Sequence, residues 1–145
     1  MASIMILNGA ARKNGNTAKL VKAFTEGAIG AGNEVREFYL QDMDIKGCMG
    51  CEHCSSAEKG QPPCIQKDDM AKINGAFLSS DVVVFASPVY FWTVTGTLKT
   101  AAGADYSQAV RWYETYERNL HWNNLGEVLG TGKTDAAFRL GASIR

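Results

Sequence analysis

The chain has 145 residues, of which 46% are hydrophobic, and its 15 basic side chains balance its 15 acidic ones. This composition predicts one soluble domain, residues 1–145, with enough apolar surface to form a core. Zero formal charge argues against the electrostatic attraction on which nucleic-acid binding depends, and no apolar run approaches the roughly 18 residues of a membrane span. Because the start of the chain lacks a basic leader, we expect a cytoplasmic protein with no membrane partner.

The first third of the chain alternates between strand and helix patterns. Apolar residues from Ser3 to Gly9 predict a strand, and the polar turn 9–17 leads from it into a helix. Helical spacing is carried by Leu20, Val21, Phe24 and Ala28. The glycines of the stretch Gly30–Asn33 end this helix, and Glu34 to Leu40 form a second, more polar strand that suits the edge of a sheet.

The same alternation continues after a cysteine-rich segment. Asp68 and Asp69 are expected to cap a helix that carries Met70, Ile73, Phe77 and Leu78. The apolar run from Asp81 to Ala86 is typical of a strand in the buried centre of a parallel sheet. The remaining predicted elements are a helix over Tyr106–Leu120, a strand over Leu125–Gly130 and a final helix over Ala136–Ile144. Alternating strands and helices predict an α/β fold in three layers, with a doubly wound parallel sheet.

All four cysteines lie in one short segment, the cysteine loop 47–65: Cys48, Cys51, Cys54 and Cys64. Two-residue spacings with a fourth cysteine nearby favour a single iron-sulfur cluster of the 4Fe-4S type. Zinc is less favoured, because structural zinc sites usually draw on two separated knuckles, and disulfides are disfavoured in a reduced compartment. A redox-active or vestigial set of thiols stays open as an alternative.

Two loops follow the first and third predicted strands, and in a wound sheet such loops meet at the ligand site. The first, Ala10 to Thr17, can bring backbone N–H groups, Arg12, Asn16 and Thr17 to a phosphate. It is not a Walker loop, because no lysine precedes Thr17. The second, Ser87 to Gly96, carries aromatic residues that can hold a flat ring. Helix caps in the first loop and core or interface aromatics in the second are the simpler alternatives.

Four motifs, in order, resemble the NADPH-dependent FMN reductase and iron-sulfur flavoprotein family: LNGAARKNGNT (7–17), DIKGCMGC (44–51), CIQKDDM (64–70) and ASPVYF (86–91). The resemblance covers residues 3–99. It implies a flavodoxin-like sheet of strand order 2-1-3-4-5, bound FMN, NAD(P)H as electron donor and a homo-oligomer. It also implies FMN contacts at Arg12, Asn14, Asn16, Thr17, Pro88, Val89, Tyr90, Phe91, Trp92, Ala102, Gly103 and Asp105, and cluster ligation by Cys48, Cys51, Cys54 and Cys64.

The chain departs from this family pattern at two places. Ala10 stands where relatives usually have serine, which removes one hydroxyl from the expected phosphate site. Thr100 directly precedes Ala101, where the family has a further helix and a fourth strand. Since a parallel crossover needs a dozen or more residues, either the sheet lacks its fourth strand or the polypeptide contains about thirty further residues at this junction. We expect the second.

The function predicted from these features is that of an FMN-dependent oxidoreductase similar to NAD(P)H-dependent FMN reductases. The flavin supplies the chemistry, so no acid or base residue of the protein is expected to be catalytic. An iron-sulfur cluster would relay single electrons to a ferredoxin-like partner, which could equally be the electron donor. The alternatives are a cluster-free reductase of quinones or FMN, a non-catalytic electron carrier, a thiol redox sensor and a structural zinc protein.

Overall fold

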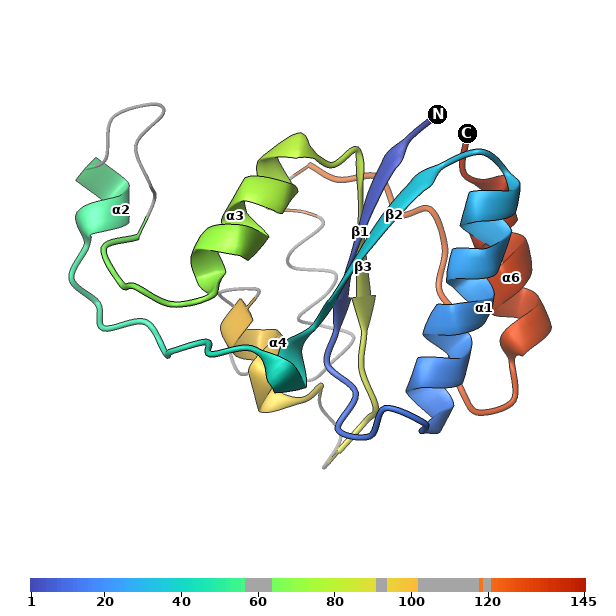
Figure 1. The fold of residues 1–145 in the computed structure, drawn as a ribbon, viewed down its shortest axis with the longest axis horizontal. Helices are drawn as coiled ribbons and strands as arrows, with labels where there is room; N and C mark the ends of the chain where they lie inside the picture. The colour runs from blue at the N-terminus through green and yellow to red at the C-terminus, as the bar shows by residue number, and fades with distance from the viewer. Residues whose placement is uncertain (57–63, 91–93, 102–117, 119–120) are drawn as a thin grey trace.

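The structure is a computed structural model that describes residues 1–56, 64–90, 94–101, 118 and 121–145 (Figure 1). Its strands are β1 (Ser3–Asn8), β2 (Glu34–Tyr39) and β3 (Val82–Ala86). Its helices are α1 (Asn16–Gly30), the short 3-10 helix η1 (Leu40–Asp42), α2 (His53–Ser56), α3 (Met70–Ser79), α4 (Gly96–Ala101) and α6 (Thr134–Ser143). The described part of the chain contains no helix long and apolar enough to cross a membrane.

The three strands form a parallel sheet in the order β2-β1-β3. Ser3 lies opposite Glu34 on one side of β1, and Ile4 lies opposite Val82 on the other. This order reproduces the first part of the predicted 2-1-3-4-5 arrangement and places the polar strand β2 at an edge, as its sequence predicted. The carboxyl ends of β1 and β3 therefore lie side by side, which is where the two predicted ligand loops begin.

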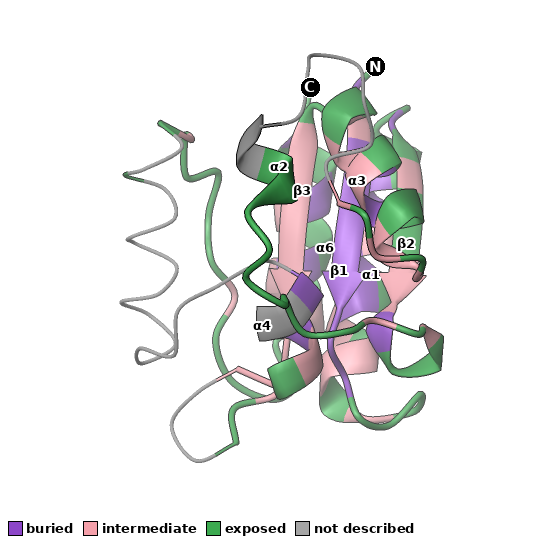
Figure 2. Cartoon of the chain, turned by 90° about the vertical axis from the view of Figure 1, so that its left-hand side faces the viewer, coloured by how far each residue is buried: buried purple, intermediate pink, exposed green. Residues whose placement is uncertain are grey.

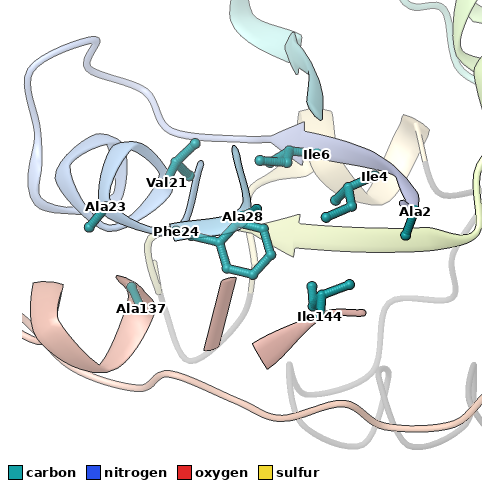
Figure 3. Packing of buried hydrophobic residues seen from close by; sticks show 9 residues of the cluster. All are labelled: Ala2, Ile4, Ile6, Val21, Ala23, Phe24, Ala28, Ala137 and Ile144. Atoms are coloured by element: carbon teal, nitrogen blue, oxygen red, sulfur yellow. The ribbon is translucent and has the colours of Figure 1, made fainter. Parts of the chain in front are cut away.

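The side chains of β1 alternate between two separate cores, which confirms the predicted three layers. Ile4 and Ile6 are 1% and 0% exposed and pack against α1 and α6, as Figure 3 shows. Met5 and Leu7 are buried on the opposite face among residues of η1, α3 and α4. Burying an aliphatic side chain of this size contributes about 1.5–3 kcal/mol. The central strand is thus held from both faces (Figure 2).

Helices α1 and α6 lie against each other on one face of the sheet (Figure 1). A Cβ atom built on Gly27 of α1 would lie 2.1 Å from the backbone oxygen of Phe138 in α6. A Cβ atom on Gly141 of α6 would lie 2.1 Å from the backbone oxygen of Phe24 in α1. The two glycines therefore let the helix backbones touch, and no residue with a side chain fits at either position without moving the helices.

Strand β3 corrects the prediction that the apolar run Asp81–Ala86 lies in the buried centre of the sheet. β3 is the edge strand of the described sheet, and each of its residues is only partly buried (Figure 2). A cavity of about 1020 Å³ runs beside it, lined by β3, α1, α6 and residues 121–129. The prediction fails because no described strand pairs with the outer edge of β3.

The predicted strand Leu125–Gly130 is also wrong, since residues 122–129 have irregular backbone. A strand needs a hydrogen-bonded neighbour, and the cavity separates this segment from β3. Gly126 and Gly130 have φ angles of +141° and +94°, far from the β region. Leu78, predicted on the apolar face of α3, is 85% exposed. The predicted helix Tyr106–Leu120 lies almost wholly outside the described residues.

The outer edge of β3 has no partner strand among the described residues, and this supports the expectation that further residues lie between Thr100 and Ala101. An apolar edge strand beside a cavity favours association with other chains, and native proteins usually cover such edges. We therefore expect intact-mass spectrometry of the protein purified from its native source to exceed 15.7 kDa by the mass of about thirty residues. A measured mass of 15.7 kDa would show that the junction is genuine and that the sheet lacks its fourth strand.

Candidate functional site

The loop between β1 and α1 begins with a buried asparagine that shapes its backbone. Asn8 is 2% exposed, and its Oδ1 accepts a hydrogen bond from the Ala10 N–H at 3.0 Å. Its Nδ2 donates to Glu37 Oε1 of β2 at 2.7 Å. Further along, the Gly15 N–H donates to the Arg12 backbone oxygen at 3.1 Å and closes a turn. These bonds give the loop a defined conformation before any ligand is present.

The N-terminus of α1 has the properties of an anion site. Gly15 is the N-cap residue in extended conformation, no side chain of the described residues caps the helix, and the first turn contains no acidic residue. The N–H groups of this turn and the positive end of the helix dipole are thus left for a ligand. This observation contradicts the simpler reading in which Asn14, Asn16 or Thr17 serves as a helix cap. Asn14 and Asn16 are exposed instead, and Thr17 is half-buried.

The two cations of this loop have different surroundings. Lys13 is paired with Asp42, and its Nζ lies 5.3 Å from the centre of the Tyr39 ring. The hydrogen bond to Asp42 raises the pKa of Lys13 above its ordinary value of 10.5. Arg12 is exposed and has no ion pair within the described residues. Of the two, Arg12 is the cation that a phosphate can recruit.

A network of short contacts fastens the second loop to the first. The Gly9 N–H donates to the Ala86 oxygen at 2.8 Å, and Thr95 Oγ1 donates to the Gly9 oxygen at 3.0 Å. The Thr95 N–H in turn donates to Ser87 Oγ at 2.9 Å. A Cβ atom on Gly9 would lie 2.5 Å from Thr95 Oγ1, so only glycine allows this approach. Neither Ser87 nor Thr95 was predicted to link the two loops, because their partners are distant in the sequence or not marked by any motif.

The predicted flavin residues are brought together only in part. Thr17 of the first loop and Val89 of the second line the same cavity of about 1020 Å³. Pro88 is half-buried, and Val89 and Tyr90 are 65% and 44% exposed beyond the end of β3. The predicted contacts that lie outside the described residues are Phe91, Trp92, Ala102, Gly103 and Asp105.

The cysteines are free thiols on the cysteine loop 47–65, and α2 in this loop lies away from the sheet (Figure 1). Cys48, Cys51 and Cys54 are exposed and Cys64 is partly buried. In the described part of the chain no three potential ligands are close enough to hold a metal ion, so the predicted ligands are not gathered. The Gly50 N–H does donate to Cys48 Sγ at 3.4 Å.

The two ends of the cysteine loop are joined by paired backbone stretches, 44–47 and 66–69, which we call the neck. The Asp44 N–H donates to Asp69 Oδ2 at 2.9 Å, and the Asp69 N–H donates to the Asp44 oxygen at 2.9 Å. Asp69 is the N-cap residue of α3, as predicted, but its side chain makes no capping hydrogen bond to the helix and instead joins the two sides of the neck. The hydrogen bond from Lys72, followed by that from Asp44, lowers the pKa of Asp69 below its ordinary value of 3.8.

The chain is similar to known proteins both in sequence and in fold. An iron-sulfur flavoprotein from Archaeoglobus fulgidus is 37% identical over 100 residues, which cover 69% of this chain and 43% of the relative. An NAD(P)H:quinone oxidoreductase from Methanothermobacter marburgensis superposes with a TM-score of 0.55 at 22% identity, covering 68% of this chain and 50% of the other. RosB, in its complex with 8-demethyl-8-formylriboflavin-5'-phosphate, gives 0.65 at 13% identity, covering 98% and 75%.

These likenesses show the flavodoxin-like α/β fold, and the chain spans about half the length of the curated relatives it matches. The profile of one family, described as NADPH-dependent FMN reductase, matches residues 2–108, which is well over half of the chain. The matched region contains the N-terminus of α1, the loop after β3 and all four cysteines. The chain therefore belongs to the NADPH-dependent FMN reductase family.

Proposed function

We propose that this protein binds FMN and uses it to pass electrons from NAD(P)H, or from a reduced protein partner, to an acceptor. The observation that carries the proposal is the fastening of two ligand loops beside an uncapped helix N-terminus, at the carboxyl ends of β1 and β3. Nucleotide-like ligands bind at this position in wound α/β sheets. The family match supports the same cofactor.

The residues present fit FMN. The first turn of α1 offers backbone N–H groups, and the exposed side chains of Arg12, Asn14 and Asn16 offer further donors for a phosphate, with Thr17 beside them. Val89 and Tyr90 supply apolar and aromatic surface for the ring system. When bound, FMN accepts a hydride and can release electrons singly or in pairs. The protein's part is to hold the phosphate, orient the ring and limit water around it.

We further propose that the cysteine loop holds a 4Fe-4S cluster through Cys48, Cys51, Cys54 and Cys64. The donor set fits in its chemistry, because all four thiols are free and the Gly50 N–H already donates to Cys48 Sγ. Several relatives are named iron-sulfur flavoproteins, which supports the same centre. The cluster would serve as a one-electron relay to a ferredoxin-like partner.

A second candidate is a cluster-free reductase that transfers electrons from FMN directly to a small acceptor such as a quinone. The observation in its favour is that the described residues do not gather three metal ligands. Either form can be told from a non-catalytic carrier by turnover. A reductase oxidises NAD(P)H with saturation when an acceptor is present, whereas a carrier only exchanges electrons with another protein. The homo-oligomer that the family resemblance implies remains part of this proposal.

Replacing Cys51 with serine should abolish the broad visible absorption of anaerobically purified protein while FMN stays bound. The reason is that a cluster with four thiolate ligands loses one of them, and the FMN loops lie elsewhere in the fold. Iron and acid-labile sulfide should approach about four each per chain in the wild type. Met49→Ser, which changes an exposed neighbour, serves as the matched control and should keep the colour. Stoichiometric zinc, or full colour in Cys51→Ser, would contradict the cluster.

A further inference from the structure

The neck of the cysteine loop has a defined structure even though the cysteines it supports are not gathered. We propose that Asp68 and Asp69 are positioning residues, which hold the two ends of the loop together so that its first and last cysteines can ligate one iron-sulfur centre. This inference rests on the cluster in the proposed function.

Two adjacent carboxylates bind alternate N–H groups of the opposite stretch, those of Asp44 and Lys46. Asp69 Oδ2 accepts from the Asp44 N–H at 2.9 Å, and Asp68 Oδ2 accepts from the Lys46 N–H at 2.9 Å. Gln66 Nε2 adds a bond of 3.2 Å to the Gly47 oxygen. Cys48 immediately follows Gly47, and Cys64 lies two positions before Gln66. The neck therefore ends where the ligand-bearing segments begin.

Both stretches of the neck are anchored to the core of the domain. Met43 and Ile45 on one side pack against the same buried cluster as Met70 and Ile73 on the other. The second oxygens of the carboxylates are also engaged: Asp68 Oδ1 accepts from the Met70 N–H at 3.0 Å, and Asp69 Oδ1 accepts from Lys72 Nζ at 2.6 Å. We call Asp68 and Asp69, with the hydrogen bonds that they accept across the neck, the clamp. The clamp is thus also bonded to the start of α3.

A clamp of this kind lowers the cost of assembling the metal centre. Lys46 and Asp68 are 22 positions apart, and bringing such distant points of a free chain together costs loop-closure entropy. Folding of the domain already brings Lys46 and Asp68 together. Iron binding therefore has only to bring the exposed Cys48, Cys51 and Cys54 into place as ligands. In the structure the neck is already hydrogen-bonded, whereas the thiols of Cys48, Cys51 and Cys54 are exposed, as this explanation requires.

The test is the double variant Asp68→Ala/Asp69→Ala, reconstituted anaerobically with ferrous iron and sulfide. We expect it to lose iron to a chelator about tenfold faster than the wild type, because two charge-assisted hydrogen bonds are removed. Hydrogen exchange of the Lys46 amide should also rise. Asp69→Asn keeps an oxygen acceptor for Asp44 and should recover most of the retention. Asp135→Ala, an exposed carboxylate on α6, is the matched control and should behave as wild type.

The iron-retention experiment has three possible outcomes, which lead to different conclusions. Faster iron loss by the double variant, with an unchanged thermal unfolding midpoint and recovery in Asp69→Asn, supports the positioning role. Faster exchange at Lys46 with unchanged iron retention would overturn it, because the clamp would then exist without helping the centre. If the wild type takes up no iron, the cluster in the proposed function fails and this inference fails with it, whereas FMN binding can still hold.

Discussion

Replacing Gly27 with alanine is expected to lower the free energy of unfolding by about 1–3 kcal/mol, the usual cost of overpacking a tight contact. The added methyl group would lie 2.1 Å from the Phe138 oxygen, which belongs to rigid helical backbone and cannot turn away. Gly141→Ala makes the reciprocal clash with the Phe24 oxygen, also at 2.1 Å, and should have a similar effect. Alanine's better helix propensity, worth up to about 1 kcal/mol, offsets only part of this loss.

Urea denaturation followed by circular dichroism measures this change. Gly75→Ala in α3 is a matched control, since among the described residues no atom beyond its own helix backbone and chain neighbours lies within 4 Å of the added Cβ. That variant gains helix propensity without a clash and should be more stable than the wild type by up to about 1 kcal/mol. The expected changes in the free energy of unfolding for Gly27→Ala and Gly75→Ala have opposite signs, so the two variants can be told apart clearly. A Gly27→Ala protein as stable as the Gly75→Ala protein would show that α1 and α6 do not pack backbone against backbone.

Arg12→Ala is expected to weaken FMN binding by about ten- to a hundredfold. The substitution removes a charge-assisted contact to the phosphate, which contributes roughly 1.5–3 kcal/mol. Lys13→Ala offers the matched control, because it removes an equal charge from the neighbouring position. Lys13 is already paired with Asp42, so its loss should reduce affinity less. Quenching of flavin fluorescence gives both dissociation constants, and an unchanged value for Arg12→Ala would remove its phosphate role.

Much of the fold could be predicted from sequence because its signals are local. The apolar strand β1 and the helical spacing of Val21, Phe24 and Ala28 in α1 each arise within a few neighbouring residues, and the structure confirms both. The place of β3 in the sheet was mispredicted for the opposite reason. An apolar run indicates burial on both faces, but whether a strand pairs on both edges depends on distant chain segments. Leu125–Gly130 failed as a strand for lack of such a partner.

The candidate site likewise combines features that neighbouring residues predict with features that depend on residues far apart in the sequence. The strand, turn and helix around the start of α1 were predictable, since a polar turn between a strand and a helix is a local pattern, and the role of this turn as an anion site stays a prediction. The contact between Thr95 and Gly9 joins residues 86 positions apart and leaves no local trace in the sequence. The neck aspartates have the same property, because their partners Asp44 and Lys46 are 25 and 22 positions away. Adjacent acids before a helix predicted a cap, and Asp68 does accept a hydrogen bond from the Met70 N–H at the start of α3. Only the tertiary structure shows that both acids also bind the opposite stretch.

Titration of the wild-type protein with FMN, and separately with riboflavin, shows whether the protein binds FMN through its phosphate. The two ligands share the ring system, but only FMN has the phosphate that the N-terminus of α1 would bind. We predict saturable quenching with one FMN per chain and a riboflavin affinity lower by about ten- to a hundredfold, as for loss of a charged hydrogen-bonding group. No saturable binding of FMN, or equal affinity for both flavins, would contradict the account.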